Sequence, residues 1–378
     1  MDIAHLETPF YLMEEAKLER NLQLLARVQR ESGARILLAL KGFAFSGGME
    51  MVGRYLQGCC ASGLHEARYG AERIGGEVHT YAPAFKAEEI DEIIDLSHHL
   101  VFNSFAQWKR FRDRAVGRVS CGLRINPECS AAPTESYNPC APFSRLGITH
   151  AQFEAALSQD SSLLEGIEGL HFHALCEEGA DALAQVLEAF EAKFGRYISR
   201  MRWINFGGGH HITKRGYDLQ KLIDLIRDFR ARYGVEVYLE PGEAVGWETG
   251  VLVASVLDIV HNGIDIAILD TSAEAHMPDT ILMPYRAEVR GAAPAGEKPY
   301  TYRLAGNTCL AGDVMGDYAF DRPLRVGDRI IFEDQIHYTI VKNTTFNGIK
   351  LPNLVLLKRD GTTEVVRRFG YAEYARRN

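Results

Sequence analysis

The chain has 378 residues, of which 46% are hydrophobic and 24% are charged, and its formal net charge is −8. This length suits a full (β/α)8 barrel with a smaller domain, and the negative charge argues against a nucleic-acid binder and suits a cationic partner. The N-terminus lacks the basic start and apolar core of a signal peptide, and no apolar run approaches the roughly 18 residues of a membrane span. The seven cysteines include no Cys-x-x-Cys pair, so we expect a reduced, cytoplasmic protein with neither a disulfide framework nor a zinc cluster.

The first 243 residues alternate between helix-like and strand-like segments. Residues 1–13 contain a short segment, residues 8–12, that is predicted to be extended. Residues 14–31 are predicted to form a helix with apolar side chains at three- and four-residue steps. Eight apolar runs follow, at residues 35–40, 58–62, 77–82, 99–103, 118–126, 166–174, 201–206 and 235–240. Amphipathic segments lie between most of them, at residues 87–96, 106–116, 180–194 and 219–233. The pattern predicts an α/β fold with a (β/α)8 TIM-like barrel over residues 14–243.

The remaining residues have a different character. Runs rich in β-branched and aromatic residues are separated by turn signals, and they lie at residues 251–260, 265–269, 287–290, 301–304, 329–332, 336–341 and 354–358. We predict a mostly antiparallel β domain of residues 244–378, joined by residues 1–13.

The fifth gap of the barrel pattern is long and rich in proline. It runs from Pro127 to Arg145 and also contains Pro133, Pro139 and Pro142. Such a loop is either functional, over the mouth of the barrel, or a tolerated surface insertion.

Polar residues and glycines gather where the predicted strands end, which is where barrels place their chemistry. They are Lys41, Arg124, His173, Gly207–Gly209 and Glu240. A single strand-end lysine usually extends to solvent. In a barrel mouth, however, desolvation lowers the pKa of a lysine and lets its amine attack an aldehyde. The coincidence at several strand ends favours the second interpretation for Lys41.

Each of the other residues also has a structural alternative. The glycine triplet is either a turn or a close approach of backbone N–H groups to an anion. His171 and His173 alternate onto one strand face, where they are either core histidines or site residues, and His173 is nearer the strand end. The pair His210-His211 has no third ligand at a suitable spacing, and we predict no metal. Glu240 is either a salt-bridge residue or the partner of a cofactor ring nitrogen.

A turn of small residues in the second domain carries a thiol and a carboxylate. It runs from Asn307 to Asp313 and contains Cys309. A free cysteine usually acts as a small buried apolar residue, but a thiol can also donate a proton.

Together these motifs resemble the fold-type III pyridoxal-phosphate decarboxylases, the family of ornithine, arginine and diaminopimelate decarboxylases with an alanine-racemase-like barrel. The motifs on which the resemblance rests occur in the family's order: Ala39-Leu40-Lys41, Leu123-Arg124-Ile125, Phe172-His173, Gly207-Gly208-Gly209, Glu240-Pro241-Gly242, Cys309 with Asp313, and Tyr338 with Thr345-Phe346-Asn347-Gly348. Within the family, the chain is most similar to the members that decarboxylate carboxylated triamines in polyamine synthesis. That closer similarity rests on residues 39–43, 171–177, 206–211 and 276–279.

The resemblance implies pyridoxal 5′-phosphate as cofactor. Lys41 would bind it covalently, His173 would stack on its ring, and Glu240 would keep its pyridine nitrogen protonated. The resemblance implies further cofactor contacts, mostly to the phosphate, from Gly207, Gly208, Gly209, Tyr338 and Arg124. Cys309 would come from the second subunit of an obligate homodimer and reprotonate the substrate carbon, with Asp313 binding the substrate beside it.

Three positions depart from the family pattern. Glu243 replaces a usual arginine, Cys60 replaces an aspartate, and Leu310 stands where diaminopimelate decarboxylases carry a glutamate. The charge reversal at Glu243 favours a substrate amine and leaves the phosphate to the glycines and Tyr338. We predict that Glu243 and Asp279 bind the amines of a polyamine acid, although Asp279 is alternatively a turn residue after Pro278.

Other functions remain as alternatives. The first is a decarboxylase of lysine, ornithine or diaminopimelate, and Leu310 counts against diaminopimelate. A racemase is disfavoured because such enzymes usually pair the ring nitrogen with arginine, where this chain has Glu240. A non-catalytic homologue is disfavoured because Lys41 and Cys309 are both present.

Overall fold

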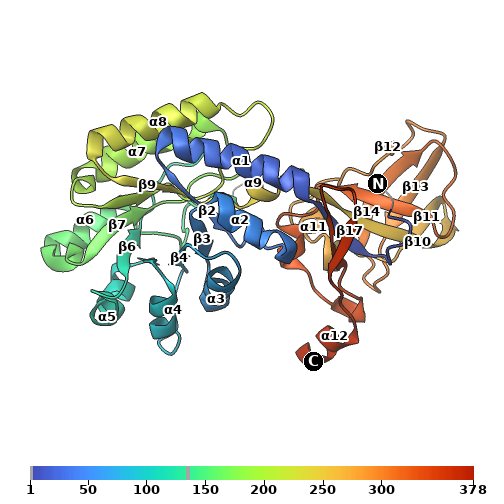
Figure 1. Cartoon of the computed structure of the whole chain (residues 1–378), viewed down its shortest axis with the longest axis horizontal. Helices are drawn as coiled ribbons and strands as arrows, with labels where there is room; N and C mark the ends of the chain where they lie inside the picture. Colours follow the sequence, from blue (N-terminus) through green and yellow to red (C-terminus); the bar gives the residue numbers. More distant parts are fainter. Residues whose placement is uncertain (1–2, 133–136) are drawn as a thin grey trace. The chain divides into compact units, whose positions relative to one another are not determined.

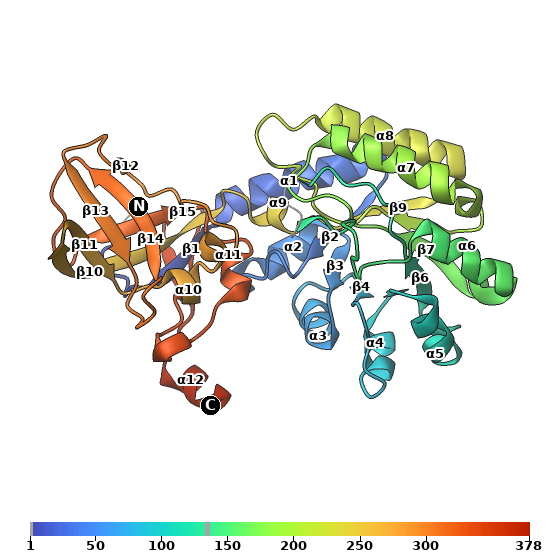
Figure 2. The same ribbon diagram turned by 180° about the vertical axis from the view of Figure 1, so that it is seen from behind.

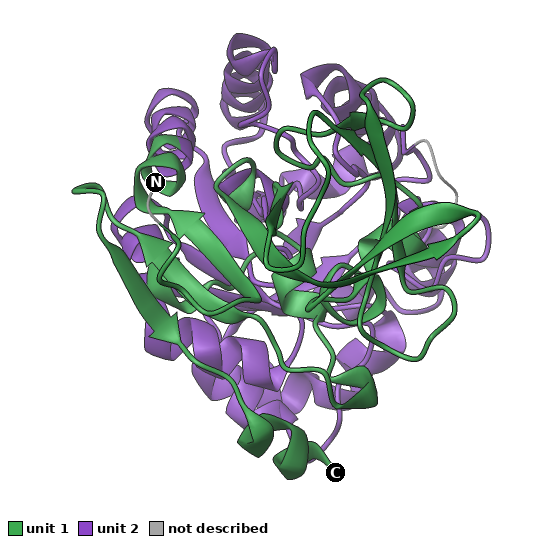
Figure 3. Cartoon of the chain, turned by 90° about the vertical axis from the view of Figure 1, so that its right-hand side faces the viewer, with its two compact units in different colours: residues 1–20, 43–48, 246–378 green, residues 21–42, 49–245 purple. Residues whose placement is uncertain are grey.

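The computed structural model of the chain describes residues 3–132 and 137–378, so Pro133 of the proline-rich gap lies outside the described residues. The chain forms two compact units, shown in different colours in Figure 3. The first unit contains residues 1–20, 43–48 and 246–378, and the second contains residues 21–42 and 49–245.

The second unit is a closed barrel of eight parallel strands, which confirms the predicted fold (Figure 1). The strands occur in chain order around the barrel: β2 (Arg35–Ala39), β3 (Gly58–Ala61), β4 (Glu77–Tyr81), β5 (His99–Phe102), β6 (Ser120–Arg124), β7 (Ile167–His171), β8 (Trp203–Asn205) and β9 (Glu236–Leu239). All eight predicted runs are strands, with ends that differ by three residues or fewer.

Helices connect the strands. The helices of this part of the chain are α1 (Glu15–Ser32), α2 (Met49–Tyr55), α3 (Leu64–Arg73), α4 (Ile90–Leu96), α5 (Phe105–Ala115), α6 (His150–Gln159), α7 (Ala180–Ile198), α8 (Leu219–Tyr233) and α9 (Glu243–Gly246). Among them, α5, α6 and α8 have side-chain N-caps. At α8, for example, the Asp218 side chain accepts the N–H of Lys221, and Gly234 adopts a left-handed φ of 68°. An N-cap aspartate and a C-terminal glycine thus define the predicted limits of this helix.

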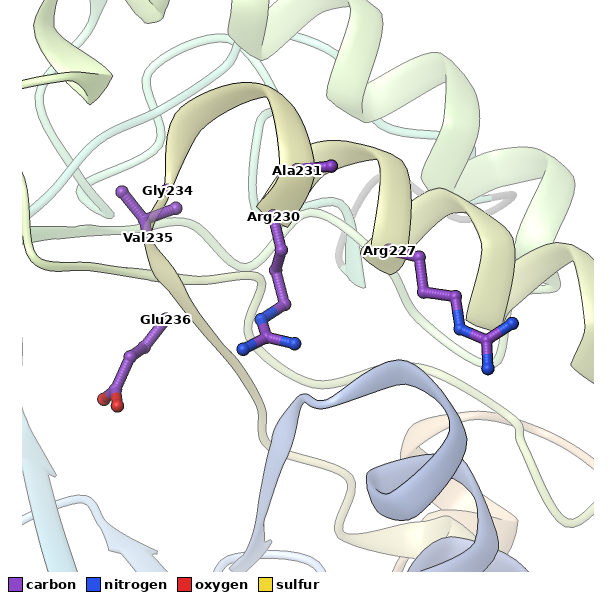
Figure 4. Close-up of a pocket in the computed structure, with 6 residues that line it drawn as sticks. All are labelled: Arg227, Arg230, Ala231, Gly234, Val235 and Glu236. Carbon is purple, nitrogen blue, oxygen red and sulfur yellow. The ribbon is translucent and has the colours of Figure 1, made fainter.

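Figure 4 shows a groove beside the C-terminal end of α8, lined by Arg227, Arg230, Ala231, Gly234, Val235 and Glu236. The two arginines donate to backbone carbonyls at the end of α1, Arg227 to Glu31 (2.5 Å) and Arg230 to Ser32 (3.2 Å). Cations suit this position because helix C-termini leave carbonyl groups unpaired and carry partial negative charge. We therefore interpret the groove as part of the α1–α8 packing.

The barrel interior is packed by complementary large and small residues. Trp203 belongs to a buried cluster with Leu37, Val101 and Tyr238. A Cβ atom at Gly122 on β6 or Gly169 on β7 would lie 2.4 or 2.1 Å from the Trp203 ring, so both positions need glycine. A dense core below the strand ends gives the site residues a rigid base.

Near the starts of β4 and β5, away from Lys41, the ligand atoms of Glu77, His79 and His99 lie within 4.8 Å of one another. Arg35 is ion-paired with the Glu77 carboxylate at 2.5 Å, and the His79 and His99 rings stack with centroids 3.9 Å apart. Because the His79 and His99 rings are stacked, their nitrogen lone pairs lie in separate planes and suit a shared metal ion poorly. The Glu77 carboxylate already has a cation as its partner, the Arg35 guanidinium. We interpret this cluster as polar packing that closes the barrel at the end where its strands begin.

The first unit contains a nine-stranded sheet (Figure 2). Its strands are β1 (Phe10–Glu14), β10 (Gly250–Asn262), β11 (Ile264–Leu269), β12 (Ala293–Pro294), β13 (Tyr300–Ala305), β14 (Val314–Phe320), β15 (Arg329–Glu333), β16 (Asn353–Leu357) and β17 (Thr363–Arg367). Most pairs are antiparallel, as predicted, and the two parallel pairs are β1–β16 and β11–β13. Short helices complete the unit: α10 (Ala273–His276), α11 (Asp279–Leu282) and α12 (Tyr371–Arg377).

Two predicted strands of this unit are wrong. Residues 336–341 turn into a 3₁₀ segment, Thr339–Lys342, after Tyr338 adopts a φ of 39° that no strand accommodates. Residues 287–290 form only an isolated bridge between Val289 and Phe332. Within the described residues, the structure contains no helix with the length and apolar character of a membrane span.

Candidate active site

The structure brings together the barrel residues predicted from strand ends. Lys41 and His173 lie two residues beyond β2 and β7, and Arg124 is the last residue of β6. The glycine loop, Gly207–Gly209, follows β8 by one residue, and Glu240 follows β9 directly. Because all strands of a parallel barrel end on the same side, these groups share one mouth.

Lys41 is held against the residues that follow β9. The Ala39 N–H donates to the Pro241 carbonyl at 3.0 Å, and a Cβ atom at Gly42 would lie 2.9 Å from the Gly242 Cα atom. Two glycines therefore let the chain after β2 approach the chain after β9. The Lys41 side chain is accessible at the mouth, but desolvation by the surrounding protein and the nearby Arg124 charge lower the pKa of its amine. A lowered pKa increases the fraction of neutral, nucleophilic amine.

Glu240 is a buried carboxylate with partners on two neighbouring strands. It is 8% exposed, its Oε1 accepts a hydrogen bond from Asn205 Nδ2 at 2.6 Å, and its Oε2 lies 3.4 Å from His171 Nε2. Burial by itself would raise the pKa of Glu240, but His171, His79 and Asn205 favour the charged form and lower the pKa to about 2. Glu240 is therefore an anion at neutral pH, as a partner of a protonated ring nitrogen must be.

His173 is oriented by the glycine loop. The Gly208 N–H donates to His173 Nδ1 at 2.9 Å, which leaves the proton of a neutral ring on Nε2. Burial and the positive charges of Lys41 and Arg124 hold the pKa of His173 well below its usual value. A neutral, fixed imidazole is suited to stacking against a flat cofactor ring.

The glycine loop fits its surroundings only without side chains. A Cβ atom would lie 2.3 Å from the Phe172 carbonyl oxygen at Gly207, 2.4 Å from the Glu240 carbonyl oxygen at Gly208, and 2.1 Å from the Leu175 carbonyl oxygen at Gly209. The N–H groups of Gly207 and Gly208 donate to Asn205 and His173 within the protein. The predicted phosphate contacts of these glycines stay predictions.

Arg124 is also buried beside the loop. Its exposed fraction is 6%, its Nη2 donates to the His173 carbonyl at 3.4 Å, and its guanidinium lies 4.5 Å from the centre of the Tyr81 ring. A cation packed on an aromatic face is fixed in place, so Arg124 contributes a rigid positive charge to the mouth.

Acidic side chains gather around Cys176, which follows β7. The thiol pKa rises to about 11 because of burial and the negative charges of Glu177, Glu243 and Glu178. Cys176 also senses the charge of Lys41, and the carboxylates that act on its thiol come from the segments after β7 and β9. Such an environment favours cationic ligands.

The other predicted residues belong to the first unit and are described within it. Cys309 is exposed, and its N–H donates to Asn347 Oδ1 at 2.7 Å. Asp279 is ion-paired with Lys342 at 2.5 Å, so a substrate amine would compete for this carboxylate. Tyr338 directly precedes the 3₁₀ segment, and its predicted phosphate contact stays a prediction.

Asp313 is buried, with an exposed fraction of 3%, and its carboxylate accepts hydrogen bonds from its own turn and from the start of α10. Its Oδ1 accepts from Ser272 Oγ and the Ala273 N–H, and its Oδ2 accepts from Thr308 Oγ1 at 2.6 Å. Asp313 thus fixes the turn that carries Cys309, and its predicted substrate contact stays a prediction.

Sequence reasoning missed Asn205 and preferred His173 over His171. The only signal for His171 is its alternation with His173 on one strand face. Asn205 precedes the glycine loop, but its partner Glu240 becomes visible only when β8 pairs with β9.

The barrel residues fit pyridoxal phosphate: an accessible amine, a buried carboxylate, a neutral imidazole and a cradle that Cβ atoms would fill occur at one mouth. A model of the family described as "Pyridoxal-dependent decarboxylase, C-terminal sheet domain" matches residues 10–335. The chain belongs to the pyridoxal-dependent decarboxylases. Within this family, it is 58% identical to a carboxynorspermidine/carboxyspermidine decarboxylase of Campylobacter jejuni, over 99% of both chains.

Two further relatives cover nearly the whole chain. A carboxyaminopropylagmatine decarboxylase of Synechocystis is 44% identical over 99% of this chain and 96% of the relative. The crystal structure of a Campylobacter jejuni carboxynorspermidine decarboxylase in complex with norspermidine superposes with a TM-score of 0.92 at 56% identity, covering 99% of this chain and 100% of that one.

Proposed function

We propose that the chain decarboxylates carboxynorspermidine and carboxyspermidine to norspermidine and spermidine in polyamine biosynthesis, with pyridoxal phosphate as cofactor. The observation that carries this proposal is the full-length similarity to decarboxylases of that name, at 58% identity. The presence of Lys41, Glu240 and His173 at one barrel mouth supports it independently.

The barrel residues have complementary roles in this reaction. Pyridoxal phosphate, when bound, accepts the electron pair that remains on the substrate carbon as carbon dioxide leaves. Lys41 would hold the cofactor covalently through its amine. Glu240 is anionic at neutral pH and would keep the ring nitrogen protonated, and the neutral His173 would stack on the ring.

Substrate selection is assigned to carboxylates. A carboxylated triamine carries a secondary and a terminal amine beyond the reacting centre, and both are cationic at neutral pH. Glu243 belongs to the acidic group that acts on Cys176, and we propose that it binds one of these amines. Asp279 would bind the other and exchange Lys342 for the substrate.

The proton step is assigned to Cys309. Its thiol is exposed on a turn fixed by Asn347 and Asp313, and a thiol can act as an acid. We propose that a homodimer supplies this thiol to the neighbouring active site, as the resemblance implies. Asp313 would bind the substrate beside the thiol, and Tyr338 would contribute to holding the cofactor phosphate. All seven cysteines have free thiols, which suits action in the reducing cytoplasm.

A second candidate function is decarboxylation of carboxyaminopropylagmatine, which the Synechocystis relative at 44% identity favours. A guanidinium tail would pair with the same carboxylates. Decarboxylation of lysine, ornithine or diaminopimelate remains the further alternative.

The proposal is tested by kinetics of the Glu243→Gln variant on carboxynorspermidine. Loss of one charge-assisted contact should raise KM about 10-fold or more with a smaller change in kcat. The matched control is Glu165→Gln, since Glu165 is exposed at the opposite end of the barrel before β7. Equal KM values for both variants would contradict the role of Glu243, and the absence of norspermidine as product would contradict the proposed function.

A further inference from the structure

Asn205 connects two parts of the barrel mouth that are far apart in sequence. It is the last residue of β8 and is 1% exposed. Its Nδ2 donates to Glu240 Oε1 at 2.6 Å, and its Oδ1 accepts the Gly207 N–H at 2.8 Å. The Gly207 carbonyl in turn accepts the Glu240 N–H at 2.8 Å. These three hydrogen bonds form a closed circuit.

The circuit fixes the orientation of the Asn205 amide. An ionised carboxylate only accepts hydrogen bonds and a backbone N–H only donates, so the amide nitrogen must face Glu240 and the amide oxygen must face Gly207. Reversing the amide would break both bonds. Asn205 therefore sets the distance between the Glu240 carboxylate and the glycine loop.

The same loop orients His173 through the Gly208 N–H. Three groups assigned to the cofactor thus depend on one buried side chain: the carboxylate at the ring nitrogen, the imidazole against the ring face and the glycine loop. We propose that Asn205 is a positioning residue, which holds Glu240 and the glycine loop in the one geometry that accepts pyridoxal phosphate. This inference rests on the proposed function.

The electrostatic surroundings of Glu240 make the proposal testable by pH. The titratable groups near its carboxylate come from several elements: His171 on β7, His79 on β4, Cys60 on β3, Lys41 after β2 and His210 after the glycine loop. His171 lies 3.4 Å from the other carboxylate oxygen, Oε2, whereas the Asn205 amide donates to Oε1. An aspartate at position 205 would place a second carboxylate in direct contact with Glu240, and two buried carboxylates at this distance share one proton.

The experiment compares the affinity of pyridoxal phosphate for the wild type and three variants, by absorbance titration of the full-length protein between pH 5.5 and 8.5. Asn205→Ala should weaken binding about 10- to 100-fold by the same factor at every pH, because it removes a hydrogen bond to a charged group. Asn205→Asp should bind nearly as well as wild type at pH 5.5, where the shared proton preserves the bond. Its relative affinity should fall as the pH rises and the two anions repel.

The matched control is Asn126→Asp. Asn126 is 5% exposed just after β6, and its Oδ1 accepts the Glu128 N–H at 2.8 Å. It undergoes the same chemical change beside a strand end, and its affinity ratio to wild type should stay constant with pH. Urea unfolding of each variant without cofactor separates a loss of stability from a loss of affinity.

A pH-independent affinity ratio for Asn205→Asp, parallel to that of Asn126→Asp, would overturn the proposal and leave Asn205 a structural residue. The measurement does not use substrate turnover. If pyridoxal phosphate binds but no polyamine acid is decarboxylated, the proposed substrate fails, while the affinity ratios still decide the role of Asn205.

Discussion

The substitution Gly208→Ala tests how tightly the glycine loop is built. The new Cβ atom would lie 2.4 Å from the Glu240 carbonyl oxygen and 3.2 Å from His173 Cε1. Carbon and oxygen atoms normally stay at least about 3.3 Å apart, so the loop or the chain after β9 must move by roughly 0.9 Å. Gly208 is outside the left-handed region, and the cost is therefore purely steric.

The clash has nowhere to relax cheaply, because one of the contacted atoms is backbone and the imidazole is fixed by the Gly208 N–H. Overpacking of this kind costs about 1–3 kcal/mol, which corresponds to a 5- to 150-fold change in the folding equilibrium. Cofactor affinity should fall as well, since Glu240 and His173 both adjoin the added methyl group.

The assay is urea unfolding of the protein without cofactor, together with absorbance titration by pyridoxal phosphate. The control is Gly195→Ala within α7, where the added Cβ atom would have no neighbour closer than 3.9 Å. Alanine is the better helix former, so this variant should be stabilised by up to about 1 kcal/mol with unchanged affinity. Unchanged stability and affinity in Gly208→Ala would refute the argument for a closely packed loop.

Three further predictions concern individual side chains. Lys41→Ala should abolish both the absorbance of covalently bound cofactor and the release of carbon dioxide, and an intact absorbance would contradict the role of this lysine. Cys309→Ala should slow turnover and reduce the fidelity of reprotonation, measured in deuterated water, while cofactor affinity is retained; unchanged turnover would make the thiol structural. At the other end of the barrel, burial opposes the ionisation of Glu77, but His79 and Arg35 outweigh it and lower its pKa to about 2. Because the pKa of an unfolded glutamate is about 4.3, the resulting stability of up to about 3 kcal/mol is present above that pH and lost as the pH falls through 2. Glu77→Gln should flatten the unfolding free energy over this range, and an unchanged pH dependence would contradict the assignment.

The barrel is predictable from the sequence because its strands and helices are each specified by residues that are close together in the sequence. Strands buried on both faces are continuous apolar runs, as at Ile36–Leu40, and helices such as α8 carry their own start and stop residues in Asp218 and Gly234. The sheet of the first unit is less predictable. The residues after Ile336 have β-branched and aromatic side chains typical of a strand, yet Tyr338 and the 3₁₀ segment that follows depend on tertiary packing.

In the candidate site, too, some features are predictable from the sequence and others are not. Residues at strand ends, such as Lys41 and Glu240, follow from the order of elements, because every strand of the barrel ends at one mouth. The contacts between them do not, since the Asn205–Glu240 bond joins residues 35 positions apart and needs the register of β8 on β9. The partners of the buried Asp313 carboxylate are likewise unpredictable, because Ser272 and Ala273 stand at the start of α10, far away in the sequence.

The measurement that tests the central claim most directly is carbon dioxide release by the purified protein with pyridoxal phosphate. The substrates would be carboxynorspermidine, carboxyspermidine, carboxyaminopropylagmatine, lysine, ornithine, arginine and diaminopimelate, compared by kcat/KM. We predict that the two carboxylated triamines exceed the simple amino acids by at least 100-fold, because Glu243 and Asp279 would each add a charge-assisted contact worth roughly 1.5–3 kcal/mol. Preference for lysine, ornithine, arginine or diaminopimelate would contradict the proposed substrate and leave only the fold and the cofactor chemistry of Lys41 and Glu240.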